Sequence, residues 1–256
     1  MKGKAAGSND NTQATYKGKV VIIGEYSVGK TSLCQRFINR VVGKTEPTIG
    51  AAFQVKTVPL PNSTQTVKLE IWDTAGSERY RSLMPMYYRD ASAAMICYDI
   101  TNAKSFERVQ VWVDDFRRHA MLQVADLPSG VGGPGTEDGP VLLLVGTKAD
   151  LANGLQETKR QVDSEIASKF AARESMSFFE TSAKTDQNVV EAFMLAAVHI
   201  SKTNKAAQAG AGPGEGLGRG RGGASTGAGS RKIDLRTGHD SDDDDQIREK
   251  KQRCGC

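Results

Sequence analysis

The residues best suited to chemistry lie between positions 19 and 32, where an apolar run leads into a loop bounded by two glycines. Gly24, Gly29, Lys30 and Thr31 satisfy the spacing G-x-x-x-x-G-K-[ST]. Backbone N–H groups of such a loop, and of the helix that follows it, converge on phosphate oxygens. The sequence therefore predicts a strand, a phosphate loop and a helix, with Lys30 at the outer phosphates and the Thr31 hydroxyl offered to Mg²⁺. A chance glycine loop, the alternative, does not account for the strand and helix on either side.

Composition limits what else the chain could be. Only 38% of its 256 residues are hydrophobic, which is low for a wholly globular protein, so part of the chain should not fold. The 34 basic and 30 acidic side chains give a net charge of only +4, which does not favour a nucleic-acid partner. No apolar run approaches the roughly 18 to 20 residues of a membrane span, and the polar amino terminus lacks the apolar core of a secretion signal. We expect a cytosolic protein.

The four cysteines do not indicate a disulfide framework. Cys34 and Cys97 lie in apolar surroundings typical of buried thiols, whereas Cys254 and Cys256 end the chain.

Hydrophobic patterning predicts the elements that hold the phosphate loop. Periodic apolar residues predict helices, and alternating or continuous apolar runs predict strands. The expected helices are 31–39, 104–119, 159–173 and 188–201, and the expected strands are 20–23, 51–60, 66–73, 93–99, 141–146 and 177–179. Together they predict a doubly wound α/β fold with a mostly parallel six-stranded sheet and one antiparallel edge strand.

Three segments are expected to lie outside the folded domain, which we place at 18–201. Residues 1–17 form a polar, flexible leader, and 121–139 form a Gly/Pro-rich surface insertion. Residues 202–256 are Gly/Ala-rich and then alternately basic and acidic, so they cannot bury enough apolar surface to fold.

Four further motifs follow the phosphate loop in the order that a guanine-nucleotide switch requires. They are Pro-Thr-Ile-Gly at 47–50, Trp-Asp-Thr-Ala-Gly at 72–76, Thr-Lys-Ala-Asp at 147–150 and Glu-Thr-Ser-Ala-Lys at 180–184. With them the chain resembles the Ras-like small GTPases over about residues 18–200 and, within these, the Rab family. The resemblance implies a P-loop fold, GTP/GDP and Mg²⁺ as cofactors, and hydrolysis of GTP.

The resemblance also implies roles for particular residues. Thr31 and Thr48 would coordinate Mg²⁺, with Asp73 holding it through water, and the Gly76 amide would contact the γ-phosphate. Catalytic roles are implied for Lys30, Thr48, Gly76 and Ser77. The implied nucleotide-binding residues are Gly24, Glu25, Tyr26, Ser27, Val28, Gly29, Lys30, Thr31, Ser32, Thr48, Gly76, Thr147, Lys148, Asp150, Ser182, Ala183 and Lys184.

Guanine recognition is expected at the last two motifs. The two oxygens of Asp150 match the N1–H and N2–H₂ donors of guanine, Lys148 would lie along the base, and the Ala183 N–H would donate to O6. Thr-Lys-Ala-Asp alone could be an ordinary strand-end loop, but its position after the apolar strand 141–146 favours the binding role. Thr147 replaces the usual Asn and should only loosen the loop.

Three positions depart from the family pattern. Ser77 stands where the family normally has the Gln that orients the attacking water, Tyr26 lies at a phosphate-loop position that is usually small, and Val42 replaces an aromatic residue over the guanine edge. The chain is similar to the Ser-for-Gln Rab branch associated with autophagy and late endocytic traffic. Ser77 and Tyr26 predict slow hydrolysis.

The chain end Cys254-Gly255-Cys256 resembles the ending on which Rab proteins receive two geranylgeranyl groups, which together anchor a protein durably to a membrane. A metal-binding pair or inert thiols are the alternatives. The resemblance therefore implies a location in the cytosol and on the cytoplasmic face of an intracellular membrane, endosomal or autophagosome-related.

Partners also follow from the resemblance. They are an exchange factor, a GTPase-activating protein, Rab escort protein, geranylgeranyl transferase, GDP-dissociation inhibitor and effectors, all binding a monomer. The implied effector surface comprises Ile49, Phe53, Trp72 and Tyr87, although core packing could also account for its aromatic residues.

Three functions compete. The first is a low-turnover GTPase used as a membrane-traffic switch. The second is a GTP-binding scaffold that hardly hydrolyses, which Ser77 and Tyr26 favour. A P-loop kinase is the third, and the hairpin that ends in Asp-Thr-Ala-Gly argues against it.

Overall fold

The computed structural model describes residues 15–124, 139–152 and 160–210, so most of the expected leader, insertion and tail lies outside it. Its six strands form one sheet in the order β2-β3-β1-β4-β5-β6, in which every neighbouring pair is parallel except β2 with β3. The strands are β1 (Tyr16–Gly24), β2 (Ala51–Pro59), β3 (Thr66–Thr74), β4 (Ala91–Asp99), β5 (Val141–Thr147) and β6 (Ser177–Glu180). The expected fold class is therefore confirmed.

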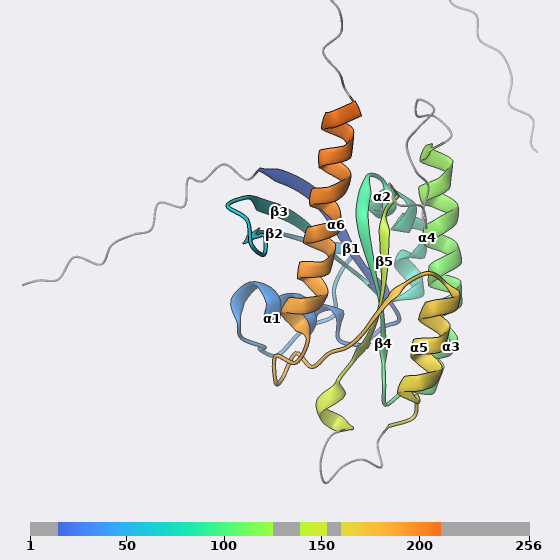
Figure 1. Ribbon diagram of the computed structural model, residues 1–256. Helices are drawn as coiled ribbons and strands as arrows, with labels where there is room; N and C mark the ends of the chain where they lie inside the picture. The colour runs from blue at the N-terminus through green and yellow to red at the C-terminus, as the bar shows by residue number, and fades with distance from the viewer. Residues whose placement is uncertain (1–14, 125–138, 153–159, 211–256) are drawn as a thin grey trace, which may run out of the picture. The chain divides into compact units, whose positions relative to one another are not determined.

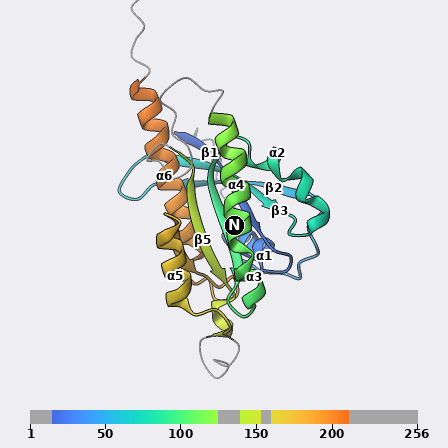
Figure 2. The same ribbon diagram turned by 90° about the vertical axis from the view of Figure 1, so that its right-hand side faces the viewer.

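Helices cover both faces of the sheet. One face carries α1 and α6, and the other carries α2, α3, α4 and α5 (Figures 1 and 2). The α-helices are α1 (Lys30–Asn39), α2 (Met84–Tyr88), α3 (Ala103–Glu107), α4 (Val109–Val124), α5 (Ser164–Arg173) and α6 (Val189–Gly210), and the 3-10 helices are η1 (Glu78–Leu83) and η2 (Ala149–Leu151). Within the described ranges no helix is both long and apolar enough to cross a bilayer.

The central strand β1 shows why the sheet needs two helical layers. Val20 and Ile22 pack into the cluster under α1 and α6, whereas Val21 and Ile23 pack into the cluster on the opposite face. Successive side chains of a strand point to opposite faces, and all four are fully buried. A continuous apolar run is thus what this strand requires, and it ends at the phosphate loop.

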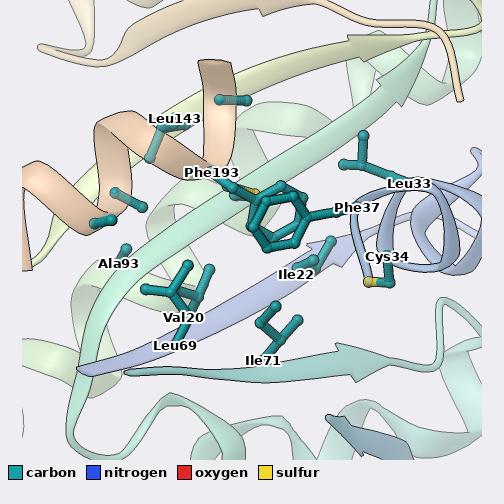
Figure 3. Packing of buried hydrophobic residues seen from close by; sticks show 14 of the residues in the cluster. Val20, Ile22, Leu33, Cys34, Phe37, Leu69, Ile71, Ala93, Leu143 and Phe193 are labelled. Atoms are coloured by element: carbon teal, nitrogen blue, oxygen red, sulfur yellow. The ribbon is translucent and has the colours of Figure 1, made fainter. Parts of the chain in front are cut away.

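Helix α1 is fixed to the core by an aromatic stack. The rings of Phe37 in α1 and Phe193 in α6 lie 3.9 Å apart at an interplanar angle of 6° (Figure 3). Cys34, one turn earlier, is buried as expected, as is Cys97 in β4. Burial raises the pKa of the Cys97 thiol to about 12, so this cysteine is an inert core residue at neutral pH.

The helix boundaries differ from several expectations. The helix expected at 104–119 is two helices that break at Arg108, and the apolar period runs across this break, so the pattern hid it. Helix α5 begins at Ser164 rather than at the expected residue 159. The Asp163 side chain caps its start by accepting hydrogen bonds from the N–H groups of Glu165 and Ile166.

The expected domain limits also change. β1 begins at Tyr16, inside the leader expected to end at 17, because the Tyr16 side chain is buried. Helix α4 continues to Val124, beyond the expected start of the insertion at 121, and α6 continues to Gly210, past the expected end of the domain at 201. Residues 78–88, which carried no expected element, form η1 and α2.

Candidate nucleotide-binding site

The phosphate loop joins the carboxyl end of β1 to the amino end of α1. Gly24, Ser27 and Gly29 have positive φ angles of 139°, 63° and 96°. A Cβ atom on Gly24 would lie 2.2 Å from the carbonyl oxygen of Cys97, so no side chain fits there. The turn therefore depends on glycine at its entry, and it delivers Lys30 to the first turn of α1.

Lys30 is only 6% exposed and folds back over the loop. Its Nζ donates to the carbonyl oxygens of Gly24 at 2.8 Å and Glu25 at 2.7 Å. Burial lowers the pKa of this amine, although Asp73 nearby opposes the shift. A phosphate placed in the loop would supply the countercharge that the buried ammonium lacks.

Three predicted metal ligands come together from three parts of the chain. The Thr31 hydroxyl donates to Oδ2 of Asp73 at 2.7 Å and lies 3.0 Å from the hydroxyl oxygen of Thr48. Asp73 is only 2% exposed, and its burial raises the pKa of the carboxyl group. Its second oxygen, Oδ1, has no hydrogen-bond partner among the residues that the structure describes.

This cluster fits Mg²⁺. Magnesium takes oxygen ligands and is usually held by one or two carboxylates, with waters and substrate phosphates completing its shell. Two hydroxyls and one carboxylate, whose Oδ1 is buried and without a hydrogen-bond partner among the described residues, supply that chemistry beside the phosphate loop. Thr31, Thr48 and Asp73 are therefore the residues that would hold the ion.

Gly76, just beyond the end of β3, approaches the phosphate loop closely. A Cβ atom there would lie 2.5 Å from both the Glu25 carbonyl oxygen and Lys30 Nζ, so only glycine fits. The next residue, Ser77, is half-buried, and its hydroxyl lies 3.4 Å from the carboxylate of its neighbour Glu78. Its side chain thus contacts its own loop.

These residues surround a cavity of about 670 Å³. Its wall includes Tyr26, Ser27, Gly29, Lys30, Thr31, Ser32, Thr48, Gly76 and Ser77. Tyr26 is 60% exposed at this wall, so an aromatic ring stands beside the space for the outer phosphates. The cavity brings together the four predicted catalytic residues and most of the predicted phosphate-binding residues, whereas Gly24, Glu25 and Val28 are not among the residues that line it.

A second cavity of about 200 Å³ shares Gly29, Ser32 and Lys148 with the first. The other predicted residues that line it are Thr147, Asp150, Ala183 and Lys184. Val42, which the sequence analysis placed where an aromatic residue usually covers the guanine edge, also lines this cavity. Oδ1 of Asp150 accepts a hydrogen bond from the Ser182 hydroxyl at 2.7 Å, which orients the carboxylate.

Thr147 connects the second cavity to the phosphate loop. Its hydroxyl oxygen lies within hydrogen-bond distance of the carbonyl oxygens of Val28 and Tyr98. Because a hydroxyl has one proton, it donates to one of these carbonyls at a time. Threonine therefore keeps a tether from the end of β5 to the phosphate loop.

Asp99 is a site residue to which the sequence analysis gave no role. Its Oδ2 lies 2.6 Å from Nζ of Lys148, which also donates to the Ser27 carbonyl oxygen at 3.0 Å. The backbone N–H and hydroxyl of Thr101 donate to the other oxygen at 2.8 and 2.7 Å. A carboxylate at the carboxyl end of a central strand was the available signal, because ligands bind at that edge of such sheets.

Glu25 contributes only its backbone to the loop interior. Its side chain turns away from the phosphate cavity, and Oε1 accepts from Nε1 of Trp112 at 3.1 Å and from Nε of Arg108 at 3.3 Å. Trp112 lies in the first turn of α4, and Arg108 directly precedes this helix. The Glu25 carboxylate thus anchors the phosphate loop to α4.

Of the four residues assigned to an effector surface, Phe53 lies on β2, Trp72 on β3 and Tyr87 on α2, and Ile49 lies in the loop before β2. The ring centroid of Trp72 lies 5.1 Å from that of Phe53 and 5.8 Å from that of Tyr87. Ile49 is 80% exposed and Phe53 51% exposed, whereas Tyr87 is nearly buried. The aromatic residues therefore form one continuous row, of which only part reaches the surface. Cys254 and Cys256, predicted lipidation sites, lie outside the described residues.

Comparison with known proteins agrees with this geometry. Residues 19–202 match the model of the family described as the Ras family. The chain is also 42% identical over 196 residues to the GTP-binding protein ypt5 of Schizosaccharomyces pombe (strain 972 / ATCC 24843), a match that covers 76% of this chain and 83% of that protein.

Proposed function

This chain belongs to the Ras family and, within it, to the Rab GTPases, and from that premise we propose that it is a slowly hydrolysing GTP/GDP switch in endocytic or autophagic vesicle traffic. In this proposal the protein cycles between the cytosol and the cytoplasmic face of an endosomal or autophagosome-related membrane. An exchange factor loads GTP, effectors bind the loaded form, and a GTPase-activating protein ends the signal.

The observation that carries the proposal is the contact between the Thr31 and Thr48 hydroxyls, 3.0 Å apart. Thr31 lies on α1, which is fixed to the core, whereas Thr48 lies in residues 41–49, which contain no helix or strand. When bound, Mg²⁺ neutralises charge on the phosphate oxygens and polarises them. Because Thr48 also belongs to its ligand set, residues 41–49 are ordered only while that set is complete.

Gly76 makes a second segment, residues 76–88, sensitive to the bound nucleotide. Its backbone lies against Glu25 and Lys30 with no room for a side chain, so its N–H group can reach the end of a triphosphate. Residues 78–88 follow directly as η1 and α2, and they carry Tyr87 of the proposed effector surface. A missing γ-phosphate would therefore be read at both segments.

Guanine is the base that this site selects. The Asp150 carboxylate provides two acceptors, and a buried polar site left unpaired by the wrong base discriminates by about 10⁴ to 10⁵. The Lys148 stem, held by Asp99, provides a flat apolar wall beside the base. The Ala183 N–H group supplies the donor that the guanine O6 requires.

Slow hydrolysis follows from Ser77. Phosphoryl transfer in these enzymes depends on positioning and electrostatic stabilisation, and the usual glutamine orients the attacking water. Ser77 is shorter, and its hydroxyl contacts Glu78. Lys30 can still stabilise the transferred phosphoryl group, so the barrier is raised by loss of water orientation alone.

A second candidate is a scaffold that binds GTP with almost no hydrolysis and presents its effector surface persistently. Tyr26 favours it, because a 60% exposed ring beside the outer phosphates obstructs the approach of an activating arginine. In this alternative, regulation would come from synthesis and membrane attachment rather than from a nucleotide cycle.

Chromatography of the nucleotide released from the purified native chain tests both functions. GDP as the main species supports a cycling switch, and GTP supports the scaffold. Adenine nucleotides, or no nucleotide together with no affinity for GDP, would overturn both.

A further inference from the structure

We propose that Arg36 is a positioning residue that holds the guanine-reading loop, residues 182–186, against α1 and thereby sets how long the nucleotide stays bound. This inference rests on the proposed function, since it concerns the same site. It adds a residue that contacts neither base nor phosphate.

All three guanidinium nitrogens of Arg36 have carbonyl partners. Nε donates to the oxygen of Ala183, Nη2 donates to that of Lys184 at 3.0 Å, and Nη1 donates to that of Arg40 at 2.6 Å. Ala183 is 147 residues away in sequence, so local chain geometry does not create this contact. The planar fork of an arginine suits several fixed acceptors at once, which a lysine ammonium does not match.

The loop that Arg36 holds carries the donor for O6 of guanine. Arg36 binds the carbonyl oxygen of Ala183, the residue whose own N–H is proposed to face the base. Ser182, just before it, is held by the Asp150 carboxylate and by its backbone bridge to Gln187. Arg36 adds a link from α1 to this loop through the carbonyl oxygens of Ala183 and Lys184.

Helix α1 links this contact to the phosphate end of the site. Its first residues, Lys30 and Thr31, serve the phosphate end of the site, and Arg36 serves the base end. The six residue steps from Lys30 to Arg36 span about 9 Å of helix at 1.5 Å per residue. Since Phe37 is buried and stacked on Phe193, one rigid helix sets the spacing between the two halves of the site.

The competing role for Arg36 is stabilisation of the fold alone. The two roles predict different effects of its loss on nucleotide binding. If Arg36 acts through Ala183, its loss should weaken guanine binding specifically through O6. If it only stabilises the domain, its loss should weaken all nucleotides equally.

The test compares GDP with 6-thioguanosine 5′-diphosphate, which keeps the N1–H and 2-amino donors and carries a sulfur, a weak hydrogen-bond acceptor, in place of O6. Dissociation constants for both are measured on the nucleotide-free native chain, Arg36→Ala, Arg36→Lys and Arg40→Ala. Arg40 is the matched control, because its guanidinium also reaches this loop, but it contacts the half-exposed Asp186 side chain, at 3.3 Å, rather than the backbone of Ala183.

We expect Arg36→Ala to raise the dissociation constant of GDP about tenfold or more, the effect typical of losing a charge-assisted hydrogen bond. The dissociation constant of the analogue should change far less. Arg36→Lys, which keeps the charge and most of the stem, should behave similarly, and it serves if the alanine variant fails to fold. Arg40→Ala should match the native chain for both ligands.

If the Arg36 variants bind GDP and the analogue with equally reduced affinity, or bind both with native affinity, the proposed role of Arg36 is overturned. Failure of the native chain to bind GDP would instead overturn the proposed function, so the two failures are distinguishable.

Discussion

The hydroxyl of Thr31 donates to the carboxylate of Asp73 at 2.7 Å, although 42 residues separate them in sequence. One belongs to the first turn of α1 and the other to the end of β3, and these elements meet because β1 and β3 pair in parallel. The register places Asp73 opposite Ile22, two residues before the phosphate loop. Sheet topology thus brings together the oxygen atoms of the proposed metal site.

Asp73→Asn should uncouple nucleotide binding from Mg²⁺. Asparagine can still accept from the Thr31 hydroxyl, but it removes the charge that supports the ion. We expect chelation by EDTA to accelerate GDP release from the native chain, and Mg²⁺ affinity of the variant to fall by about ten- to a hundredfold, as for other outer-shell partners. GDP release measured across a Mg²⁺ titration decides this, and an unchanged Mg²⁺ midpoint would remove Asp73 from the ion's surroundings.

Asp150→Asn should shift base preference from guanine toward xanthine. The substitution replaces one acceptor with a donor that faces a donor of guanine, and unpaired polar groups in such sites discriminate by up to about 10⁴. Competition among GTP, ATP and XTP for the purified variant measures the shift. Ser182→Ala is the control, because it frees the carboxylate without changing its acceptors. An identical order of affinities in the variant and the native chain contradicts the assignment.

Asp99→Asn should speed GDP release by releasing Lys148. The ion pair is 2.6 Å long and the Asp99 side chain is only 9% exposed, so it is weakly screened. If Asp99 acts through Lys148, the double variant with Lys148→Met should release GDP no faster than Lys148→Met alone. Thr101→Val, which removes only the neighbouring hydroxyl, is the control. Additive effects in this cycle would show that Asp99 acts by another route.

Much of this site could be predicted from local sequence, and the remainder could not for identifiable reasons. The phosphate loop can be recognised from the sequence because Gly24, Gly29 and Lys30 lie within a span of seven residues. Arg36 gave no signal, because its partner Ala183 is 147 residues away in sequence and no local pattern encodes such a pair. Asp99 gave only its position at the carboxyl end of a central strand, and its pairing with Lys148 could not be read from the sequence. Fold class followed from apolar runs, whereas the break at Arg108 left the apolar period intact.

Membrane attachment is predicted to require both terminal cysteines, because a single lipid chain gives only marginal, reversible binding. The double variant Cys254→Ser with Cys256→Ser should be found in the soluble fraction, whereas each single variant should retain partial attachment. Sedimentation of the tagged full-length chain with membranes measures this. Cys34→Ala is a suitable control, since that thiol is buried. Sedimentation of the double variant at the native level would disprove the lipid attachment.

Intrinsic hydrolysis should be limited by Ser77, and hydrolysis stimulated by an activating protein should be limited by Tyr26 as well. A glutamine amide can both donate to and accept from the attacking water, whereas the Ser77 hydroxyl, which lies 3.4 Å from Glu78, is too short to reach it. A misplacement of about 1 Å can cost roughly a hundredfold in rate. We therefore expect the native chain to hydrolyse GTP more slowly than the roughly 3 to 5 × 10⁻⁴ s⁻¹ of a glutamine-bearing relative.

Single-turnover measurements on the native chain, Ser77→Gln, and Ser77→Gln with Tyr26→Gly test this expectation. Ser77→Gln should be at least several-fold faster, because it restores the group that orients water. The second substitution should matter mainly when an activating protein is added, since Tyr26 stands at the exposed mouth of the cavity. Glu78→Gln is the matched control, because it changes the partner of Ser77 without supplying a glutamine at position 77. If neither Ser77 variant exceeds the native rate, another group already positions the water, and a slow switch cannot be attributed to these two residues.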